Sequence, residues 1–292
     1  MFPNQFEYHS PGTVAEAVAL LKKHGDDAKV LSGGHSLVPL MKLRFAAPAV
    51  IVDINGIPHL DYVKEEGGVL KIGALAREST LELSPLIQSK FPLIADAAKL
   101  IADPQVRNRA TVAGNLAHGD PANDHPAVML ALGAELVLTG SSGQRTVPIT
   151  EFFVDTLATA LAPDEILTEI RVPVPPAGSG GAYYKIERKV GDFATVAVGS
   201  QLTLDKAGKV VKAGIGLTNV GTTPIKATDA EAYLVGKTPD DATLDEAGRL
   251  AMEMSDPVSD TRAPADYKKA MVRQLTVRTL RRAAERAKGN QA

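Results

Sequence analysis

The N-terminal part of the chain alternates helical and extended hydrophobic patterns. A helix is predicted from Thr13 to Gly25, because apolar residues recur there at helical spacing and Thr13 and Glu16 form a capping-box pattern. Short apolar strands are predicted at residues 29–31, 50–54 and 69–73. The 50–54 strand is so apolar that we expect it to be buried on both faces.

The middle of the chain is predicted to be helical at first and then to form a hairpin. The predicted segments are helices at residues 79–91 and 92–101, a loop-rich stretch at 103–126, a helix at 127–132, and a hairpin at 135–148 around Gly140-Ser141-Ser142-Gly143.

A domain boundary is predicted between Val172 and Gly181, because the prolines and glycines there cannot continue a helix or a central strand. Beyond it the pattern changes to a meander of strands and then to helices. The predicted elements are strands at 182–189, 195–204 and 210–217, a tight turn at 205–208, and helices from Ile225, Leu244 and Ala265. This order of elements predicts an α+β fold.

Length, charge and composition narrow the possible functions. The 292 residues suggest about two domains at ~150 residues each. The formal net charge of −2 provides no overall attraction for nucleic acid or an anionic membrane. The chain has no cysteine, which excludes disulfides, thiolate zinc sites, cysteine-ligated iron–sulfur clusters and a cysteine nucleophile on this chain.

The sequence predicts neither secretion nor insertion into a membrane. The start lacks the basic and apolar regions of a secretory signal, and the apolar stretch at 127–138 is shorter than the ~20 residues that span a bilayer. We therefore expect a cytoplasmic protein with no membrane span. The basic run at 272–282 fits a nucleic-acid helix or an amphipathic terminal helix, and we favour the second interpretation.

Two segments combine glycine with small or hydroxyl-bearing residues beside short apolar elements. They are Ser32, Gly33, Gly34, His35 and Ser36, and Thr111, Val112, Ala113, Gly114 and Asn115. Glycine lets the main chain approach a bulky anion, and successive N–H groups form an anion-binding concavity. Two such loops facing each other would hold a pyrophosphate without Lys or Arg. Two ordinary tight turns would explain the same residues, so the residues alone leave both interpretations open.

Dinucleotide binding of the doubly wound kind is not indicated, because no G-x-G-x-x-G follows a strand. The segment from His118 to His125 holds two of the six histidines, together with Asp120 and Asp124. Imidazole and carboxylate suit zinc or iron, but the spacing matches no familiar ligand set. A plain loop is the favoured explanation, followed by a polar loop that binds sugar-like hydroxyls, and we predict no metal site.

A set of motifs follows in order along the chain: Phe6-Glu7-Tyr8-His9, residues 32–39, residues 101–109, residues 111–115, residues 119–124, Gly191-Asp192-Phe193-Ala194-Thr195 and Leu217-Thr218-Asn219-Val220. This combination resembles the FAD-binding medium subunits of the molybdenum hydroxylases, the xanthine dehydrogenase family, and is most similar to their aerobic carbon monoxide dehydrogenase branch. The resemblance implies a two-subdomain FAD-binding domain of the vanillyl-alcohol-oxidase/PCMH type at residues 1–177, with subdomains at about 1–57 and 58–177. A smaller C-terminal α+β domain of the carbon monoxide dehydrogenase flavoprotein type would follow at 178–292.

The resemblance also implies roles for particular residues. The two glycine-bearing segments, Ser32 to Ser36 and Thr111 to Asn115, would cradle the FAD pyrophosphate. Asp124 would accept hydrogen bonds from ribityl hydroxyls, with Asn115 and His118 close by. Leu161 and Lys185 match positions that line the cofactor, and Phe193 matches an aromatic residue that covers the isoalloxazine ring. No residue is implied to act as a catalytic acid or base.

The chain departs from the family pattern at three of these positions. Ser32 stands where relatives often have Ala, and Phe193 stands where close relatives have Tyr. Ala113 replaces a usual Gly, and a positive φ there would cost Ala roughly 1 kcal/mol. Binding of FAD is expected to be non-covalent, because a cysteinyl link is impossible and His35 lies in the pyrophosphate loop.

The implied function is electron transfer. A large partner subunit would hold the molybdenum cofactor and oxidise the substrate, which for this branch is carbon monoxide. A small partner subunit would carry the iron–sulfur clusters, and FAD on this chain would pass electrons to a quinone or another acceptor. The expected assembly is a dimer of heterotrimers. Other possibilities are a medium subunit serving an aldehyde, purine or N-heterocycle hydroxylase, a flavin-free binding or scaffold protein, and an autonomous flavin oxidase.

Overall fold

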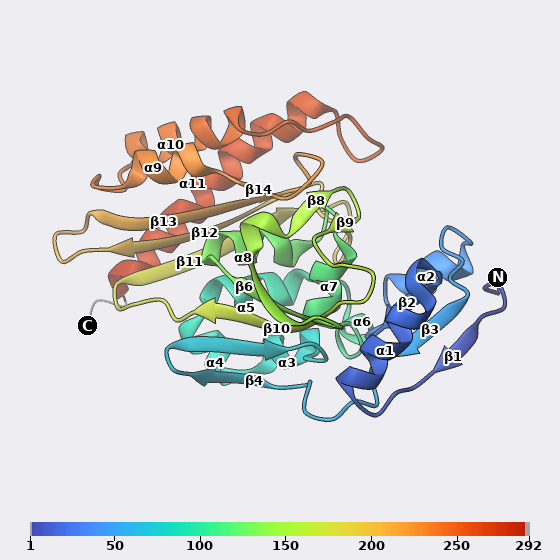
Figure 1. Cartoon of the computed structure of the whole chain (residues 1–292). Coiled ribbons are helices and arrows are strands. Elements are labelled where there is room, and N and C mark those ends of the chain that lie inside the picture. Colours follow the sequence, from blue (N-terminus) through green and yellow to red (C-terminus); the bar gives the residue numbers. More distant parts are fainter. Residues whose placement is uncertain (1, 290–292) are drawn as a thin grey trace.

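The computed structural model describes residues 2–289. The chain starts with a small parallel sheet at one end of the molecule (Figure 1). Its strands are β1 (Glu7–His9), β2 (Ala28–Leu31) and β3 (Val50–Asp53), in the order β1-β3-β2, and they are connected by α1 (Val14–His24), a 3-10 turn (Gly25–Asp27) and α2 (Leu37–Lys42). Val50, Ile51 and Val52 in the central strand are buried, as their apolar pattern predicts.

The predicted capping box at α1 forms only in part. Thr13 Oγ1 accepts a hydrogen bond from the N–H of Glu16, at 3.1 Å, as expected. The Glu16 carboxylate accepts from the N–H of Gly12, at 2.8 Å, instead of the N–H of Thr13. Glu16 therefore stabilises the turn that precedes the helix.

A larger antiparallel sheet follows, with the order β4-β5-β10-β6-β7. Its strands are β4 (Val63–Glu66), β5 (Val69–Gly73), β6 (Glu135–Gly140), β7 (Gly143–Pro148) and β10 (Ile166–Pro173). The predicted hairpin at 135–148 is confirmed as β6 and β7. A 3-10 turn (Ile149–Glu151) then leads to a short hairpin of β8 (Phe153–Asp155) and β9 (Ala158–Thr159).

The helices between β5 and β6 differ from the prediction. They are α3 (Glu78–Leu83), α4 (Pro85–Lys90), α5 (Pro92–Leu100), α6 (Pro104–Arg107), α7 (Val112–His118) and α8 (Asp124–Leu132). The single helix predicted at 79–91 is wrong, because Pro85 starts a new helix that Ser84 caps. The loop predicted at 103–126 is also wrong. Asp103 and Thr111 each accept an N–H of the first turn of a short helix there.

The C-terminal part is a meander of strands covered by helices. The strands are β11 (Ser179–Ile186), β12 (Val196–Leu204), β13 (Val210–Thr218) and β14 (Ile225–Lys226), and the helices are α9 (Thr228–Leu234), α10 (Asp241–Glu253) and α11 (Ala265–Gly289). The meander is confirmed, but Ile225 begins an edge strand instead of a helix. Gly180 and Gly181 lie inside β11 and do not interrupt it. Glycine is needed at both positions, because a Cβ would lie 2.3 Å from a carbonyl oxygen of α11 at Gly180 and 2.2 Å from the Gln201 side chain at Gly181.

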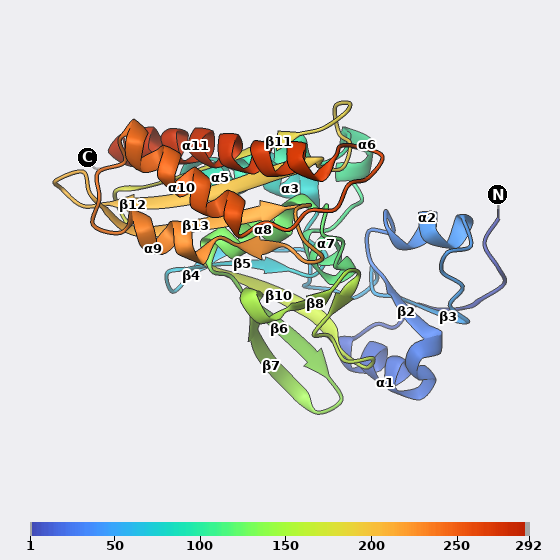
Figure 2. The same ribbon diagram turned by 90° about the horizontal axis from the view of Figure 1, so that it is seen from above.

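The main body is layered (Figures 1 and 2). Helices α9 and α11 cover one face of the β11–β14 sheet, with α10 packed against both of them, and α5 and α8 separate the other face from the larger antiparallel sheet. Gly214 and Gly216 allow this contact, since a Cβ at either position would lie about 2 Å from a carbonyl oxygen of α8. The α+β fold class is confirmed. Among residues 2–289 no helix is long and apolar enough to cross a membrane.

Candidate functional site

The structure brings the two glycine-bearing segments into direct contact. The hydroxyls of Ser32 and Thr111 lie 2.9 Å apart and form a hydrogen bond. A Cβ at Gly33 would lie 2.5 Å from the carbonyl oxygen of Arg109 and 2.7 Å from Cα of Ala110. The segments therefore meet main chain against main chain, and only glycine fits at position 33.

The first segment connects β2 to α2 and exposes a row of main-chain donors. Within residues 2–289, the N–H groups of Gly33, Gly34, His35 and Ser36 donate to no protein acceptor. Gly34 has φ +79°, in the left-handed region that glycine adopts without strain. Successive free N–H groups around a left-handed glycine form the type of concavity that binds anions.

The second segment is the start of a helix, α7, and neither a loop nor a tight turn. Thr111 caps α7 by accepting the N–H of Gly114 at 3.2 Å, and the side chains of Val112 and Ala113 are buried in the core. Ala113 is helical and is not among the described residues with positive φ. The expected strain at Ala113 is therefore absent, and its methyl group contributes to packing.

Asn115, further along α7, carries a polar atom that the protein leaves free. Its side-chain oxygen is buried and has no hydrogen-bond partner within residues 2–289. Its carbonyl accepts the side-chain amide of Asn123 at 2.8 Å, which ties α7 to the residue before α8. A buried amide oxygen without a partner is costly, so Asn115 is suited to bind a hydroxyl group of a ligand.

Asp124, at the start of α8, belongs to a second cluster together with Lys185. Its carboxylate accepts the hydroxyl of Tyr183 at 2.5 Å and the ammonium of Lys185 at 3.3 Å. Burial raises the pKa of Asp124, against the opposing charge of Lys185. Burial and the neighbouring Asp124 carboxylate raise the pKa of Tyr183 well above its ordinary value, so Tyr183 stays a donor. Sequence reasoning missed Tyr183.

Lys185 links this cluster to the loop that carries Phe193. Its buried ammonium also donates to the carbonyls of Leu100, at 2.7 Å, and Asp192, at 3.0 Å. Arg262 donates to the carbonyl of Phe193 at 3.0 Å and holds the pKa of the Asp192 carboxyl well below its ordinary value. Sequence reasoning also missed Arg262.

Phe193 is 45% exposed, and the Arg262 guanidinium carbon lies 6.0 Å from the centroid of its ring. An exposed aromatic ring on a loop fixed from both sides is suited to stack on a flat ligand.

Two expected cofactor-binding residues remain, His118 and Leu161, and His125 was considered as a metal ligand. His118 ends α7, and burial lowers its pKa. Leu161 packs partly against the core, two residues beyond β9, which contacts α7. His125 is fully buried and binds Glu78, and within residues 2–289 no group of three or more His, Asp or Glu side chains could hold a metal ion.

Free main-chain donors, a buried unpaired amide and an exposed ring fit the parts of FAD: its pyrophosphate, its ribityl chain and its flat isoalloxazine ring. Residues 4–175 match the family described as the FAD binding domain in molybdopterin dehydrogenase. The chain belongs to this family of flavoproteins. Residues 181–283 match the carbon monoxide dehydrogenase flavoprotein C-terminal domain. The resemblance inferred from the motifs is therefore confirmed.

Individual flavoproteins of this family are similar over their whole length. The carbon monoxide dehydrogenase medium chain of Hydrogenophaga pseudoflava is 48% identical over 281 residues, which cover 96% of this chain and 97% of that one. The corresponding chain of Afipia carboxidovorans is 47% identical over 288 residues, with 99% and 98% covered. A solved structure of the Hydrogenophaga pseudoflava enzyme superposes with a TM-score of 0.95 at 49% identity, over 98% of this chain and 99% of that one. The chain is thus an FAD-binding medium subunit of the molybdenum hydroxylase type, one part of a multi-subunit oxidoreductase.

Proposed function

We propose that this chain is the electron-transferring flavoprotein subunit of a carbon monoxide dehydrogenase. The observation that carries the assignment of the site is the contact between the Ser32–Ser36 and Thr111–Asn115 segments beside unpaired main-chain donors. The relatives that are 47% and 48% identical, both carbon monoxide dehydrogenase medium chains, support the choice of substrate.

The proposed binding mode assigns one part of FAD to each group of residues. The N–H groups of residues 33–36 would hold the pyrophosphate. Asn115 and His118 would bind the ribityl chain, together with Asp124. The Asp124 carboxylate has about four acceptor positions, and within residues 2–289 two of them accept hydrogen bonds. Phe193 would cover the isoalloxazine ring, with Lys185 and Leu161 along the rest of the cofactor. Binding would be non-covalent, because the chain has no cysteine for a cysteinyl link and His35 lies in the segment that would hold the pyrophosphate.

When bound, FAD supplies the redox chemistry by accepting electrons and passing them on. The residues of this chain bind and orient the cofactor, and none of them acts as an acid or base toward the carbon substrate. We propose that electrons arrive from iron–sulfur clusters of a small partner subunit, that a large subunit carries the molybdenum cofactor, and that the acceptor is a quinone or a similar molecule. The absence of cysteine supports this division, because the clusters need ligands on another chain.

The dimer of heterotrimers, the cytoplasmic location and the domain boundary at 177/178 also remain proposals. Two separate hydrophobic clusters support the boundary, one mainly before it and one entirely after it. The native mass of the purified complex tests the assembly, because one heterotrimer and two heterotrimers differ by a factor of two.

The purified chain is expected to be yellow. FAD absorption should survive dialysis and leave the protein on acid precipitation, because the cofactor is held without a covalent bond. Coexpression with the large and small subunits should then yield dye reduction that depends on carbon monoxide. A colourless chain that takes up no added FAD would refute the cofactor assignment. Dye reduction with an aldehyde, a purine or an N-heterocycle, and none with carbon monoxide, would refute the substrate.

Replacing Asp124 with alanine is expected to weaken FAD binding by about 1–3 kcal/mol, because a buried charged acceptor is lost. FAD titration into the stripped protein measures the change. The matched control is Tyr183→Phe, which removes the hydroxyl bound to Asp124 and keeps the carboxylate. Equal FAD affinity in wild type and Asp124→Ala would remove Asp124 from the binding site.

A further inference from the structure

Two stretches of chain meet at the proposed FAD site: residues 32–36 and residues 109–111, which lead into α7. We call them the two FAD loops. Hydrogen bonds made by side chains hold them together. Within residues 2–289, no main-chain hydrogen bond joins residues 32–36 to residues 109–111. The hydroxyl contact between Ser32 and Thr111 is one direct link. A second link runs through Arg77, just before α3, and Asn55, just after β3.

Arg77 and Asn55 form a continuous chain of hydrogen bonds between the loops. Arg77 Nη1 donates to the carbonyl of Arg109 at 2.5 Å, and Arg77 Nη2 donates to Asn55 Oδ1 at 2.7 Å. Asn55 Nδ2 donates to the carbonyl of Ser32 at 2.7 Å. The Arg109 carbonyl is the same group that a Cβ at Gly33 would strike. The chain of bonds therefore fixes the point where the loops come closest.

Asp53 fixes the orientation of the Asn55 side chain. Its main-chain N–H and its Nδ2 both donate to Asp53 Oδ1, at 2.9 and 2.6 Å. With Nδ2 shared between two oxygens, Oδ1 is left to accept from Arg77. A planar arginine can direct two parallel donors at two different acceptors, which a lysine ammonium on its flexible stem does less well.

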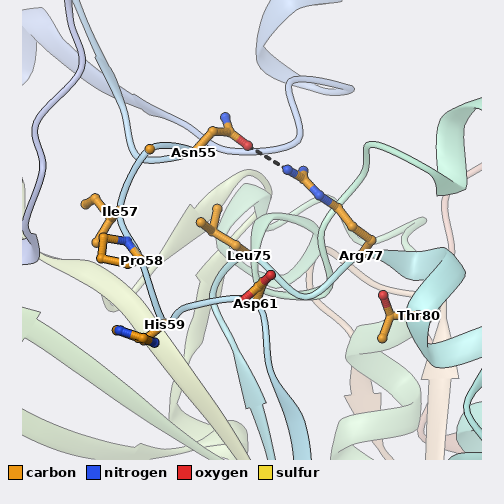
Figure 3. A pocket seen from close by; sticks show the side chains of 9 residues that line it. Asn55, Ile57, Pro58, His59, Asp61, Leu75, Arg77 and Thr80 are labelled. Carbon is orange, nitrogen blue, oxygen red and sulfur yellow. Dashed lines mark hydrogen bonds between the residues drawn. The ribbon is translucent and has the colours of Figure 1, made fainter.

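Little packing could replace these hydrogen bonds. Arg77 and Asn55 form part of the wall of a cavity of about 300 Å³, which Pro58, His59 and Asp61 also line (Figure 3). Figure 3 shows the two side chains meeting along one side of this space. Open space beside the contact means that its geometry depends on directed hydrogen bonds more than on close packing.

We propose that Arg77, acting with Asn55, is a positioning residue for FAD. It holds the carbonyls of Ser32 and Arg109 at a fixed separation and so sets the shape of the main-chain cradle for the pyrophosphate. This inference rests on the proposed FAD site. Neither residue belongs to the motifs that identify the family, and neither is assigned to bind the cofactor directly.

The test compares FAD affinity with the stability of the stripped full-length chain. Arg77→Met removes every donor and keeps the apolar stem, and it is expected to weaken FAD about 10-fold or more. Arg77→Lys keeps a charged N–H donor group but loses the planar pair of nitrogens, and it should be intermediate. Asn55→Ala should weaken FAD as well, and the double variant should lose no more than the stronger single variant, because both act through one chain of bonds.

The matched control is Arg286→Met in α11. Arg286 also donates to one carbonyl, that of Gly181, and to one side chain, Asp96, but it lies outside the two loops. This variant should lower the unfolding temperature without FAD at least as much as Arg77→Met does, because it also breaks an ion pair with Asp96, and it should leave FAD affinity within about twofold. Arg77→Met with unchanged affinity, or with a loss no larger than that of Arg286→Met, would overturn the inference. If Arg77→Met does not fold, Arg77→Lys and Asn55→Ala carry the same comparison. A wild-type chain that binds no FAD refutes the proposed function instead.

Discussion

The Gly33→Ala variant is expected to lose most of its FAD. Its Cβ would lie 2.5, 2.7 and 2.9 Å from atoms of Arg109, Ala110 and Thr111, and all three are main-chain atoms that cannot rotate away. The two loops would have to separate, at a cost of about 1–3 kcal/mol. We expect this cost to fall on the FAD-bound state and to lower FAD affinity by about 5- to 150-fold, which titration of the stripped protein measures.

Two other glycines serve as controls for this variant. A Cβ at Gly12 would meet only the Glu16 carboxylate, at 3.6 Å, so Gly12→Ala should bind FAD normally. Gly34→Ala adds left-handed strain of roughly 1 kcal/mol, and its nearest neighbour is a valine side chain at 3.3 Å. Gly33→Ala should therefore be the most harmful of the three. Wild-type affinity in Gly33→Ala would show that the contact between the loops does not shape the cofactor site.

The Glu78→Ala variant is expected to be destabilised by about 3–5 kcal/mol. Glu78 and His125 are fully buried, and Glu78 Oε2 lies 2.6 Å from His125 Nε2. Removing the carboxylate leaves the imidazole buried without its partner. Denaturant unfolding of the chain measures the loss. The surface pair of Glu7 and His9, at 2.9 Å, is a matched control, and Glu7→Ala should cost no more than about 1 kcal/mol.

The same pair makes stability depend on pH. Burial opposes protonation of His125, but the Glu78 and Asp124 carboxylates outweigh it, and the pKa of His125 is raised above 6.5. The folded state therefore binds this proton more tightly than the unfolded state. The contribution is complete below about pH 6.5 and is lost as the pH rises through the raised pKa. Wild type should lose more stability between pH 6 and pH 9 than Glu78→Ala does. Parallel pH profiles for the two proteins would contradict the assignment.

Much of the fold follows from local sequence patterns. The apolar strand at 50–54, the hairpin at 135–148 and the meander after residue 181 were all predicted, because strands and turns of this kind depend on residues close in sequence. The predictions that were wrong, the single helix at 79–91 and the loop at 103–126, concern segments in which one or two residues decide where a helix begins. Pro85 divides a helix, while Asp103 and Thr111 start short helices in a segment that looks like a loop. Asp and Thr are preferred N-cap residues, so the starts of these two short helices are indicated by the local sequence.

The candidate site was only partly visible in the sequence. The glycine-bearing segments stood out by composition, and the family motifs supplied Asp124, Lys185 and Phe193 as candidates. Tyr183, Arg262, Arg77 and Asn55 carried no signal, since an isolated arginine or asparagine between two elements has the same local pattern wherever its side chain points. Their roles come from partners 22 to 69 residues away, and only the folded chain brings these together.

By itself the sequence determined the family, the α+β class and the presence of two glycine-bearing segments, because each of these depends on residue types and their spacing. The tertiary structure alone decided that the segments touch and that Asp124 faces Tyr183 and Lys185. The physical reason is that hydrogen bonds and close contacts depend on distance and direction in space. Those are set only when the sheets and helices pack together.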